Sequence, residues 1–364
     1  MSRQRVAYLQ LLLAVVVIGL TACASGGPPA RLNYGIGEAP EGRRVFWPPE
    51  PEIPRYLYAG QLTGEENFVH DGDKGGVRSF FRWLVGLVGG EDAPIILQRP
   101  QAVTGDAQGR IYVTDVSRAA VLIFDAPAGE LKVREYASGL KRFVSPIGIA
   151  VAADGSLWVA DAQLALIAHL DPRGKTLPPL GFGQLHRPTG IALDAAKGEL
   201  YVSDTYDHDI KVFATDGRLL RTLGSRGEAP GQFNYPTHLA LADGHLYVTD
   251  TMNNRIQVMP LAGGEPQIIG ERGLYYGNLV RPKGVAVDSE HNVYIVESYY
   301  DNLLVFDREG RFLMPIGGVG QGTGKFYLPA GVWVDGHDRV FVADTFNGRI
   351  AVFQYLGRSG ERDG

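Results

Sequence analysis

Two glycine-rich segments carry residue types that could bind phosphate or calcium, and both lack residues that such sites need. Residues 317–325 have the glycine content of a phosphate-binding loop, but Val319 occupies the first glycine position and Phe326 the Ser/Thr position. Residues 71–76 (DGDKGG) begin like a calcium loop, yet Arg82 stands where the closing glutamate is needed. The chain also has no HExxH, paired-cysteine or GxSxG motif. We therefore expect no metal, no cofactor and no catalytic residue.

Six acidic residues recur along the chain, each at the end of an apolar stretch: Asp115, Asp161, Asp204, Asp250, Glu297 and Asp344. A ring of carboxylates could bind a metal. A carboxylate at the point where a strand becomes a loop can instead accept hydrogen bonds from backbone N–H groups. A chemical function is rarely needed six times, so the recurrence favours this structural role.

The positions of these acids are set by a repeat that also carries six prolines: Pro100, Pro146, Pro188, Pro236, Pro282 and Pro329. The gaps of 46, 42, 48, 46 and 47 residues have the length of one four-stranded blade. Within a copy, β-branched and apolar runs such as 246–250 (LYVTD) and 255–259 (RIQVM) alternate with turns such as Asp154-Gly155. The pattern predicts an all-β fold, a six-bladed β-propeller.

Three of the copies have closely similar sequences, DTYDHDIKVF from Asp204, DTMNNRIQVM from Asp250 and DTFNGRIAVF from Asp344. With connectors such as GSRGEAPGQFNYP, they resemble the NHL repeat over residues 97–356. The first two copies depart from this pattern after Asp115 and Asp161, so the register of their strands is less well defined.

The last copy provides only three strands, which leaves an edge that a propeller must cover. Residues 55–62 (RYLYAGQL) are the strand-like run before the first repeat, and we predict that they close the last blade. The propeller then spans residues 55–356, followed by a disordered tail at 357–364. Residues 63–96 become an insertion on the top face, the face where the first strand of each repeat begins.

A short amphipathic helix is predicted inside this insertion, because apolar residues fall on one helical face: Val77, Phe80, Phe81, Leu84 and Val88. Such a helix either packs on the rim of the propeller or serves as a lid.

The N-terminus has the features of an export signal, with Arg3 and Arg5 before the apolar run 6–20. The run ends in Leu-Thr-Ala-Cys and resembles the lipobox of bacterial lipoproteins, which predicts a signal peptide at 1–22 and acylation of Cys23, the single cysteine. We expect a Pro/Gly-rich tether at 23–54 and a protein anchored to the membrane of the cell envelope through lipidated Cys23. Ala24, in place of Asp, favours the outer membrane.

The formal net charge of −5 and the expected export argue against nucleic acid as a partner. Known NHL-like propellers include the peptidyl-hydroxyglycine lyase domains, which hold zinc through histidines from several blades. At the equivalent positions after the six prolines, this chain offers only His238, and together with His186 it falls short of the three or four ligands that zinc needs. We therefore predict a monomeric binding scaffold, not an enzyme. A lyase or hydrolase, lyase-like or lactonase-like, with a metal site near His238 is the alternative.

The predicted recognition surface is on the top face. Two residues after four of the strand-ending acids stand large side chains: Tyr206, Met252, Tyr299 and Phe346. With the nearby cations Arg187, Arg281 and Lys283, and with His238, they form a candidate patch for an envelope protein, peptide or glycan. The alternative is that these rings fill gaps between the blades.

Overall fold

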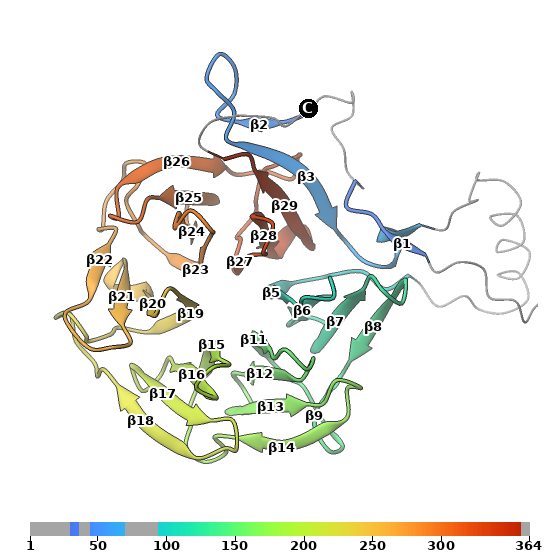
Figure 1. Cartoon of the computed structure of the whole chain (residues 1–364), viewed down its shortest axis with the longest axis vertical. Helices are drawn as coiled ribbons and strands as arrows, with labels where there is room; N and C mark the ends of the chain where they lie inside the picture. Colours follow the sequence, from blue (N-terminus) through green and yellow to red (C-terminus); the bar gives the residue numbers. More distant parts are fainter. Residues whose placement is uncertain (1–29, 36–43, 70–93, 358–364) are drawn as a thin grey trace, which may run out of the picture.

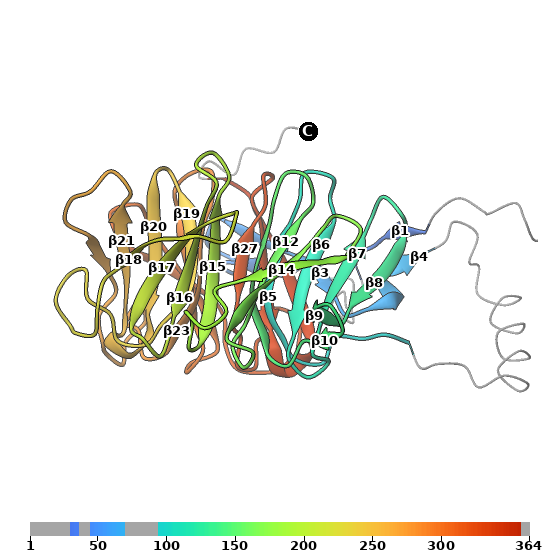
Figure 2. The same cartoon turned by 90° about the horizontal axis from the view of Figure 1, so that it is seen from below.

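The computed structural model describes residues 30–35, 44–69 and 94–357, which form a ring of six antiparallel sheets around a central axis (Figure 1). The predicted all-β, six-bladed β-propeller is confirmed. In each blade the strands follow one another from the axis to the rim, and seen from the side the ring is a flat disc (Figure 2).

The first three blades each contain four strands in sequence order. Blade 1 comprises β5 (Pro100–Gly105), β6 (Ile111–Asp115), β7 (Ala120–Asp125) and β8 (Glu130–Arg134). Blade 2 comprises β11 (Pro146–Val151), β12 (Leu157–Asp161), β13 (Leu166–Leu170) and β14 (Thr176–Leu180). Blade 3 comprises β15 (Pro188–Asp194), β16 (Glu199–Asp204), β17 (Asp209–Ala214) and β18 (Leu219–Leu223). A small hairpin of β9 (Tyr136–Ser138) and β10 (Lys141–Arg142) connects the first two blades, and it was not predicted from the sequence.

The other three blades follow the same order, except that the last is completed from the N-terminus. Blade 4 comprises β19 (Pro236–Ala242), β20 (His245–Asp250), β21 (Arg255–Pro260) and β22 (Gln267–Ile269). Blade 5 comprises β23 (Pro282–Val287), β24 (Val293–Glu297), β25 (Asn302–Phe306) and β26 (Phe312–Gly317). Blade 6 comprises β27 (Val332–Val334), β28 (Arg339–Asp344), β29 (Arg349–Tyr355), β3 (Tyr56–Leu62) and β2 (Phe46–Trp47). Three single-turn 3-10 helices are described, η2 (Glu65–Asn67), η3 (Thr251–Asn253) and η4 (Thr345–Asn347).

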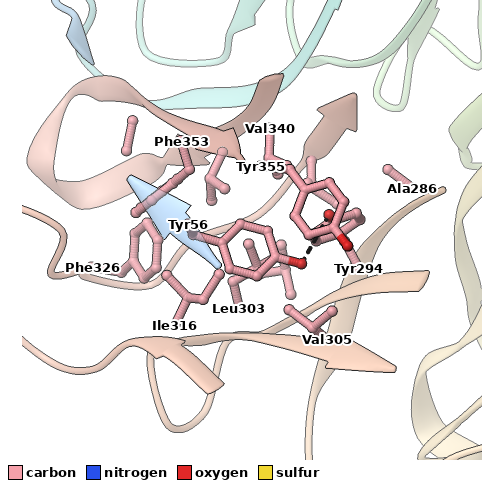
Figure 3. Close-up of a cluster of buried hydrophobic side chains, with 14 of the residues drawn as sticks. Tyr56, Ala286, Tyr294, Leu303, Val305, Ile316, Phe326, Val340, Phe353 and Tyr355 are labelled. Atoms are coloured by element: carbon pink, nitrogen blue, oxygen red, sulfur yellow. Dashed lines mark hydrogen bonds between the residues drawn. The ribbon is translucent and has the colours of Figure 1, made fainter. Parts of the chain in front are cut away.

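The hydrophobic core is divided among the interfaces between neighbouring blades. All five residues of β6 are buried, because a second strand is covered by a neighbouring blade on each face, whereas four of the five residues of the outer strand β18 are exposed. Six apolar clusters result, one for each pair of adjacent blades. Figure 3 shows the cluster between blades 5 and 6. Because each blade packs against its neighbours in the same way, the apolar residues recur at the same positions of each repeat.

The loop between the second and third strands has the same backbone shape in every blade. The residue just before the third strand is left-handed in all six, with φ between 50° and 61°: Ala119, Ala165, His208, Asn254, Asp301 and Gly348. Asn and Gly tolerate this conformation best, and alanine adopts it at a cost. The two alanines belong to blades 1 and 2, whose loop sequences depart from the repeat pattern.

The prediction that residues 55–62 close the ring is confirmed. Strand β3 pairs antiparallel with β29, and the register runs from Tyr56 opposite Tyr355 to Leu62 opposite Ile350 (Figure 1). A bulge interrupts the pairing at Gly60, where φ is 135° and an added Cβ would meet the carbonyl of Tyr34 at 1.9 Å. The first and last strands of the propeller thus lie side by side.

Part of the segment predicted as a tether is packed on the propeller instead. Strand β2 extends blade 6 beyond β3, and Trp47 packs edge-on against Phe353 at 5.4 Å. Strand β1 (Arg31–Leu32) pairs with β4 (Phe68–Val69) beside blade 1. The proline content indicated an extended chain correctly, but the few apolar residues between the prolines are enough to dock it. The predicted helix between Val77 and Val88 lies outside the described residues.

Candidate functional site

The six strand-ending acids are structural, as predicted. The carboxylate of Asp161 accepts hydrogen bonds from four backbone N–H groups, those of residues 144, 145, 163 and 164. Asp115 accepts four equivalent hydrogen bonds, and Glu297 accepts hydrogen bonds from three backbone N–H groups. Each acid thereby fixes the chain entering its blade to the loop that leaves the second strand. These carboxylates are buried and their lone pairs are occupied, so they form no metal-binding ring.

In the repeats that follow the pattern most closely, the acid also holds a cation. Asp250 Oδ2 lies 2.8 Å from Arg255 Nε and from Asn253 Nδ2, and Asp344 contacts Arg349 and Asn347 in the same way. The recurring Asp, Asn and Arg are therefore one buried ion-pair network that shapes the loop.

Blade 3 has the single group in the described part of the chain that could share a metal ion, namely His186, Asp204 and Asp207. A protein cation is already in place there, since Lys211 Nζ lies 2.9 Å from Asp204 and 2.5 Å from Asp207. His186 Nδ1 is 2.7 Å from Asp207, and this contact raises the pKa of the exposed imidazole. The group is a lysine-centred ion-pair cluster.

The threonine after the acid joins one blade to the next. Thr205 donates to the carbonyl of Pro236 at 2.8 Å, and Thr345 donates to that of Pro100 at 2.8 Å, which links blade 6 to blade 1. Thr251 makes the same bond to Pro282. The Asp-Thr pair in the repeat is therefore explained by geometry alone.

A central channel with a volume of about 290 Å³ follows the axis and is lined by the six innermost strands. Glycines stand where these strands approach most closely: an added Cβ at Gly190 would meet the Thr237 carbonyl at 2.1 Å. Blade 4 has His238 at the corresponding position. The rest of the channel wall is mostly apolar side chains and backbone, including Ile149, Leu241 and Val285, with Thr104 as a further polar residue.

His238, which was predicted to belong to the binding patch, lies in the wall of the central channel. Its Nδ1 is 3.2 Å from Thr237 Oγ1, and its buried Nε2 has no hydrogen-bond partner among the described residues. Burial, with the charge of Lys283 as a second cause, lowers the pKa of His238 to about 3. The ring is therefore neutral at physiological pH. No second histidine lines the described channel.

The hydroxyl groups of Thr237 and Thr251 determine which ring nitrogen of His238 carries the proton. Thr251 donates to the Pro282 carbonyl, so Thr237, 2.7 Å from Thr251, donates to the Thr251 oxygen. The Thr237 oxygen is then available only as an acceptor, and His238 Nδ1 carries the proton. The unpaired Nε2 is consequently an acceptor.

The large side chains predicted on the top face are exposed there. Tyr206, Met252 and Tyr299 have exposed fractions of 57%, 60% and 59%, and Phe346 has 45%. Because the innermost strands begin, and the second strands end, on this face, all four residues share it. The alternative, that these side chains fill gaps between the blades, does not agree with these exposed fractions.

Further exposed aromatics come from the connectors between blades, which the sequence analysis overlooked: Phe182, Tyr235, Tyr275, Tyr276 and Tyr327. Some pair with the predicted residues, as Tyr235 does with Tyr206 and Tyr327 with Phe346. Of this set only Tyr235 directly precedes a repeat proline, so the repeat pattern alone could not have identified the others.

Arginines lie over two of the exposed rings, those of Tyr206 and Phe346. The guanidinium of Arg187 is 5.2 Å from the Tyr206 ring centre, and that of Arg99, which was not predicted, is 4.8 Å from the Phe346 ring centre. Arg281 is exposed and Lys283 is half-buried. Burial, with the charge of Arg281 as a second cause, lowers the pKa of Lys283.

Two open grooves at the rim were also missed. They have volumes of about 920 and 980 Å³ and lie on either side of the loop that follows β2, against β26. Their shared lining includes Pro48, Glu52, Leu313 and Met314. The grooves exist because the N-terminal segment docks on blade 6, which the sequence analysis did not anticipate.

The predicted signal peptide (1–22) and the predicted acylation site Cys23 lie outside the described residues. Within the described part of the chain, there is no apolar helix of membrane-spanning length.

Family models match parts of the chain. The NHL repeat matches residues 185–213 and 233–259, and a model described as a 6-bladed beta-propeller matches residues 281–359. The chain therefore contains NHL repeats in a six-bladed propeller.

Two animal proteins are similar over about a third of the chain. The mouse peptidyl-glycine alpha-amidating monooxygenase is 31% identical over 141 residues, and the Drosophila melanogaster protein brain tumor is 28% identical over 140 residues. The alignments cover 35% and 36% of this chain but only 14% and 12% of the relatives. The matched region is thus a small part of each relative.

Solved structures with this fold include proteins of different kinds. An auxiliary nutrient binding protein from Bacteroides thetaiotaomicron has a TM-score of 0.58 at 15% identity, over 72% of this chain and 70% of its own. A virginiamycin B lyase from Staphylococcus aureus has a TM-score of 0.51 at 17% identity, over 70% and 94%. At these identities the likeness shows the fold alone.

Proposed function

We propose that this propeller is a binding scaffold of the cell envelope, held at the membrane by lipidated Cys23, whose top face recognises a protein, peptide or glycan. The observation that carries the proposal is the set of exposed aromatic side chains and arginines that surrounds the channel on one face. Tyrosine and arginine are enriched in the energetic centres of interfaces, because they bury a large area at a small cost in side-chain entropy.

The loops that carry these side chains are held rigidly, which supports recognition by a preformed surface. The loop of Tyr206 starts at Asp204, whose carboxylate is fixed by Lys211 and by two backbone N–H groups. Thr205 anchors the same loop to the next blade. A surface that is ordered before binding loses less conformational entropy when a partner docks.

A lyase or hydrolase that uses a metal near His238 is the second candidate. It is favoured by the free acceptor Nε2 and by the amidating monooxygenase and lyase among the similar proteins. Among the described residues that line the channel there is no second histidine and no carboxylate to serve as a co-ligand. Stoichiometric zinc or calcium in the purified protein, lost together with turnover in His238→Ala, would replace the scaffold proposal by this one.

The test of recognition compares two variants with three exposed large side chains removed in each. Tyr206→Ser/Met252→Ser/Tyr299→Ser changes the top face, and Leu219→Ser/Leu220→Ser/Ile268→Ser changes outer strands at the rim. Envelope material is crosslinked to the full chain and quantified by mass spectrometry. We expect the top-face variant to lose its specific partners by about 30-fold or more, since loss of one interface anchor of about 2 kcal/mol has that effect. Equal loss in both variants, or no loss in either, would refute the proposal.

The anchoring part of the proposal has its own test. The full chain and Cys23→Ser are expressed in a bacterium, and membrane and soluble fractions are compared. We expect acylated wild-type protein in the outer-membrane fraction and release of the variant, because removing the acyl chains removes the apolar anchor. An unacylated wild-type protein would contradict it.

A further inference from the structure

The mouth of the central channel has basic side chains at equivalent positions of alternate blades. The residue before the repeat proline is arginine in blades 1, 3 and 5, namely Arg99, Arg187 and Arg281. Blade 5 adds Lys283 directly after its proline. Because each innermost strand begins at this point on the top face, these positions encircle the mouth (Figure 1).

We propose that the channel mouth is an anion-binding site, in which Lys283 and Arg281 hold a carboxylate or phosphate group of the ligand. The inference rests on the proposed recognition function and specifies the chemistry of what is recognised. Arg99 and Arg187 stand further round the mouth and add to its positive charge.

The first support is that these cations have no acidic partner. Among residues 30–35, 44–69 and 94–357, no ion pair includes Arg281 or Lys283, whereas Arg255 of blade 4 and Arg349 of blade 6 are paired with Asp250 and Asp344. Glu297, which lies opposite Pro282 in the strand pair, accepts backbone N–H groups, and its attraction to Arg281 is not a direct ion pair. The protein therefore sequesters the local negative charge and leaves the positive charge free.

The second support is the environment of Lys283. Lys283 as a whole is half-buried, and burial together with the neighbouring Arg281 lowers the pKa of its ammonium group. An unpaired cation in such a place is unfavourable unless a counter-charge arrives. Hydrogen bonds between an ammonium or guanidinium and an oxyanion are the strong, charge-assisted kind. An anionic ligand group would compensate both charges together.

The third support is His238, whose side chain is next to this site. Its unpaired Nε2 is buried and is an acceptor, so a complementary ligand places a hydrogen-bond donor against it. Lys283 provides donors and His238 an acceptor. A ligand in which an acidic group is accompanied by an O–H or N–H, or by a bound water, satisfies both.

The arginines that cover aromatic rings remain able to bind. Stacking uses the flat face of the Arg99 guanidinium over Phe346 and of the Arg187 guanidinium over Tyr206. The N–H groups around the edge of each guanidinium stay available to an oxyanion. The aromatic set and the cations thus form one surface for an acidic ligand.

The test titrates the full-length protein with two probes, citrate for the carboxylate source and inorganic phosphate, at constant ionic strength in calorimetry. We expect saturable binding of at least one probe, and the tighter one identifies the acidic group of the ligand. Lys283→Met should weaken this binding about tenfold or more, equivalent to about 1.4 kcal/mol. Lys283→Arg should retain most of the affinity. Arg218→Gln, at an exposed turn on the opposite face, is the matched control and should change the affinity less than twofold.

Stability provides a second readout. Lys283→Met removes an unpaired, partly buried charge, so in anion-free buffer it should melt at the same temperature as the wild type or higher. The probe should raise the melting temperature of the wild type and not that of the variant. Absence of saturable binding, or equal weakening by Arg218→Gln, would overturn the anion site.

The two proposals fail in different ways. Loss of envelope partners in the top-face variant with full retention in Lys283→Met would leave the recognition function standing and overturn the anion site. Saturable anion binding that depends on Lys283, with unchanged partners in the top-face variant, would keep the anion site and refute the aromatic recognition surface.

Discussion

The closure of the ring can be tested at one buried hydrogen bond. Tyr56 of β3 and Tyr294 of β24 have their hydroxyl oxygens 3.1 Å apart inside the cluster between blades 5 and 6 (Figure 3). Tyr294 donates to Asp288 at 2.7 Å, so its own proton is used and Tyr56 must donate to Tyr294. Burial raises the pKa of both phenols, which keeps both protonated at neutral pH.

This order of donors makes the two single variants unequal. Tyr56→Phe loses a neutral hydrogen bond and leaves Tyr294 paired with Asp288, so it should cost about 1 kcal/mol. Tyr294→Phe loses a bond to a carboxylate and also strands the Tyr56 hydroxyl, so it should cost about 3 kcal/mol. In the double variant no hydroxyl is stranded, and the loss should be about 1 kcal/mol smaller than the sum of the single losses.

The assay is chemical unfolding of the four proteins, followed by tryptophan fluorescence. Tyr206→Phe, at an exposed ring, is the control and should change the free energy of unfolding by less than about 0.5 kcal/mol. Equal costs for Tyr56→Phe and Tyr294→Phe, or strict additivity in the double variant, would refute the assigned donor order.

Three further outcomes are expected. Thr345→Val should lower the free energy of unfolding by about 1–2 kcal/mol in chemical denaturation, because it breaks the bond to Pro100 that joins the last blade to the first. His238→Gln should reduce the loss of stability on acidification, measured by acid unfolding. In the unfolded chain His238 binds a proton near pH 6.5, whereas its pKa in the folded protein is about 3. Below pH 6.5 the wild type therefore loses up to about 1.4 kcal/mol of stability per pH unit. His186 should titrate above the usual histidine pKa by NMR, with its attraction to Asp207 present at low pH and lost as pH rises, and Asp207→Asn should abolish the upward shift.

The first two of these experiments have a control at a residue of the same type that lacks the contact or the burial being tested. Thr215→Val changes a threonine for which no side-chain hydrogen bond is present, and it should leave the unfolding midpoint unchanged. His337→Gln should leave the acid sensitivity as it is, because His337 is exposed. A Thr345→Val protein as stable as the wild type would show that the inter-blade bond is not needed, and unchanged acid sensitivity in His238→Gln would show that His238 is solvated.

The repeated features of the fold were predictable because rotation presents the same physical problem six times. The spacing of Pro100 and its five counterparts gave the blade length, and the need to satisfy loop N–H groups explained the acids. The incomplete last copy pointed to residues 55–62, since an uncovered edge strand is unfavourable.

Features that occur only once were not predictable in this way. Strand β2 and the rim grooves depend on a long-range contact between Trp47 and Phe353, which no local pattern encodes. The place of His238 in the channel wall was not predicted, because the sequence does not show that this position faces the next inner strand. Arg99 was not predicted, although it directly precedes a repeat proline, as Arg187 and Arg281 do.

The pairing of β3 with β29 has a consequence for biosynthesis. The ribosome makes β3 first, and its partner emerges only when nearly the whole chain has been translated, so the completed ring cannot form early. Until then the apolar face of β3 has no partner strand. A product that terminates before Arg349 would keep that face uncovered, and we expect it to be degraded faster than the full chain.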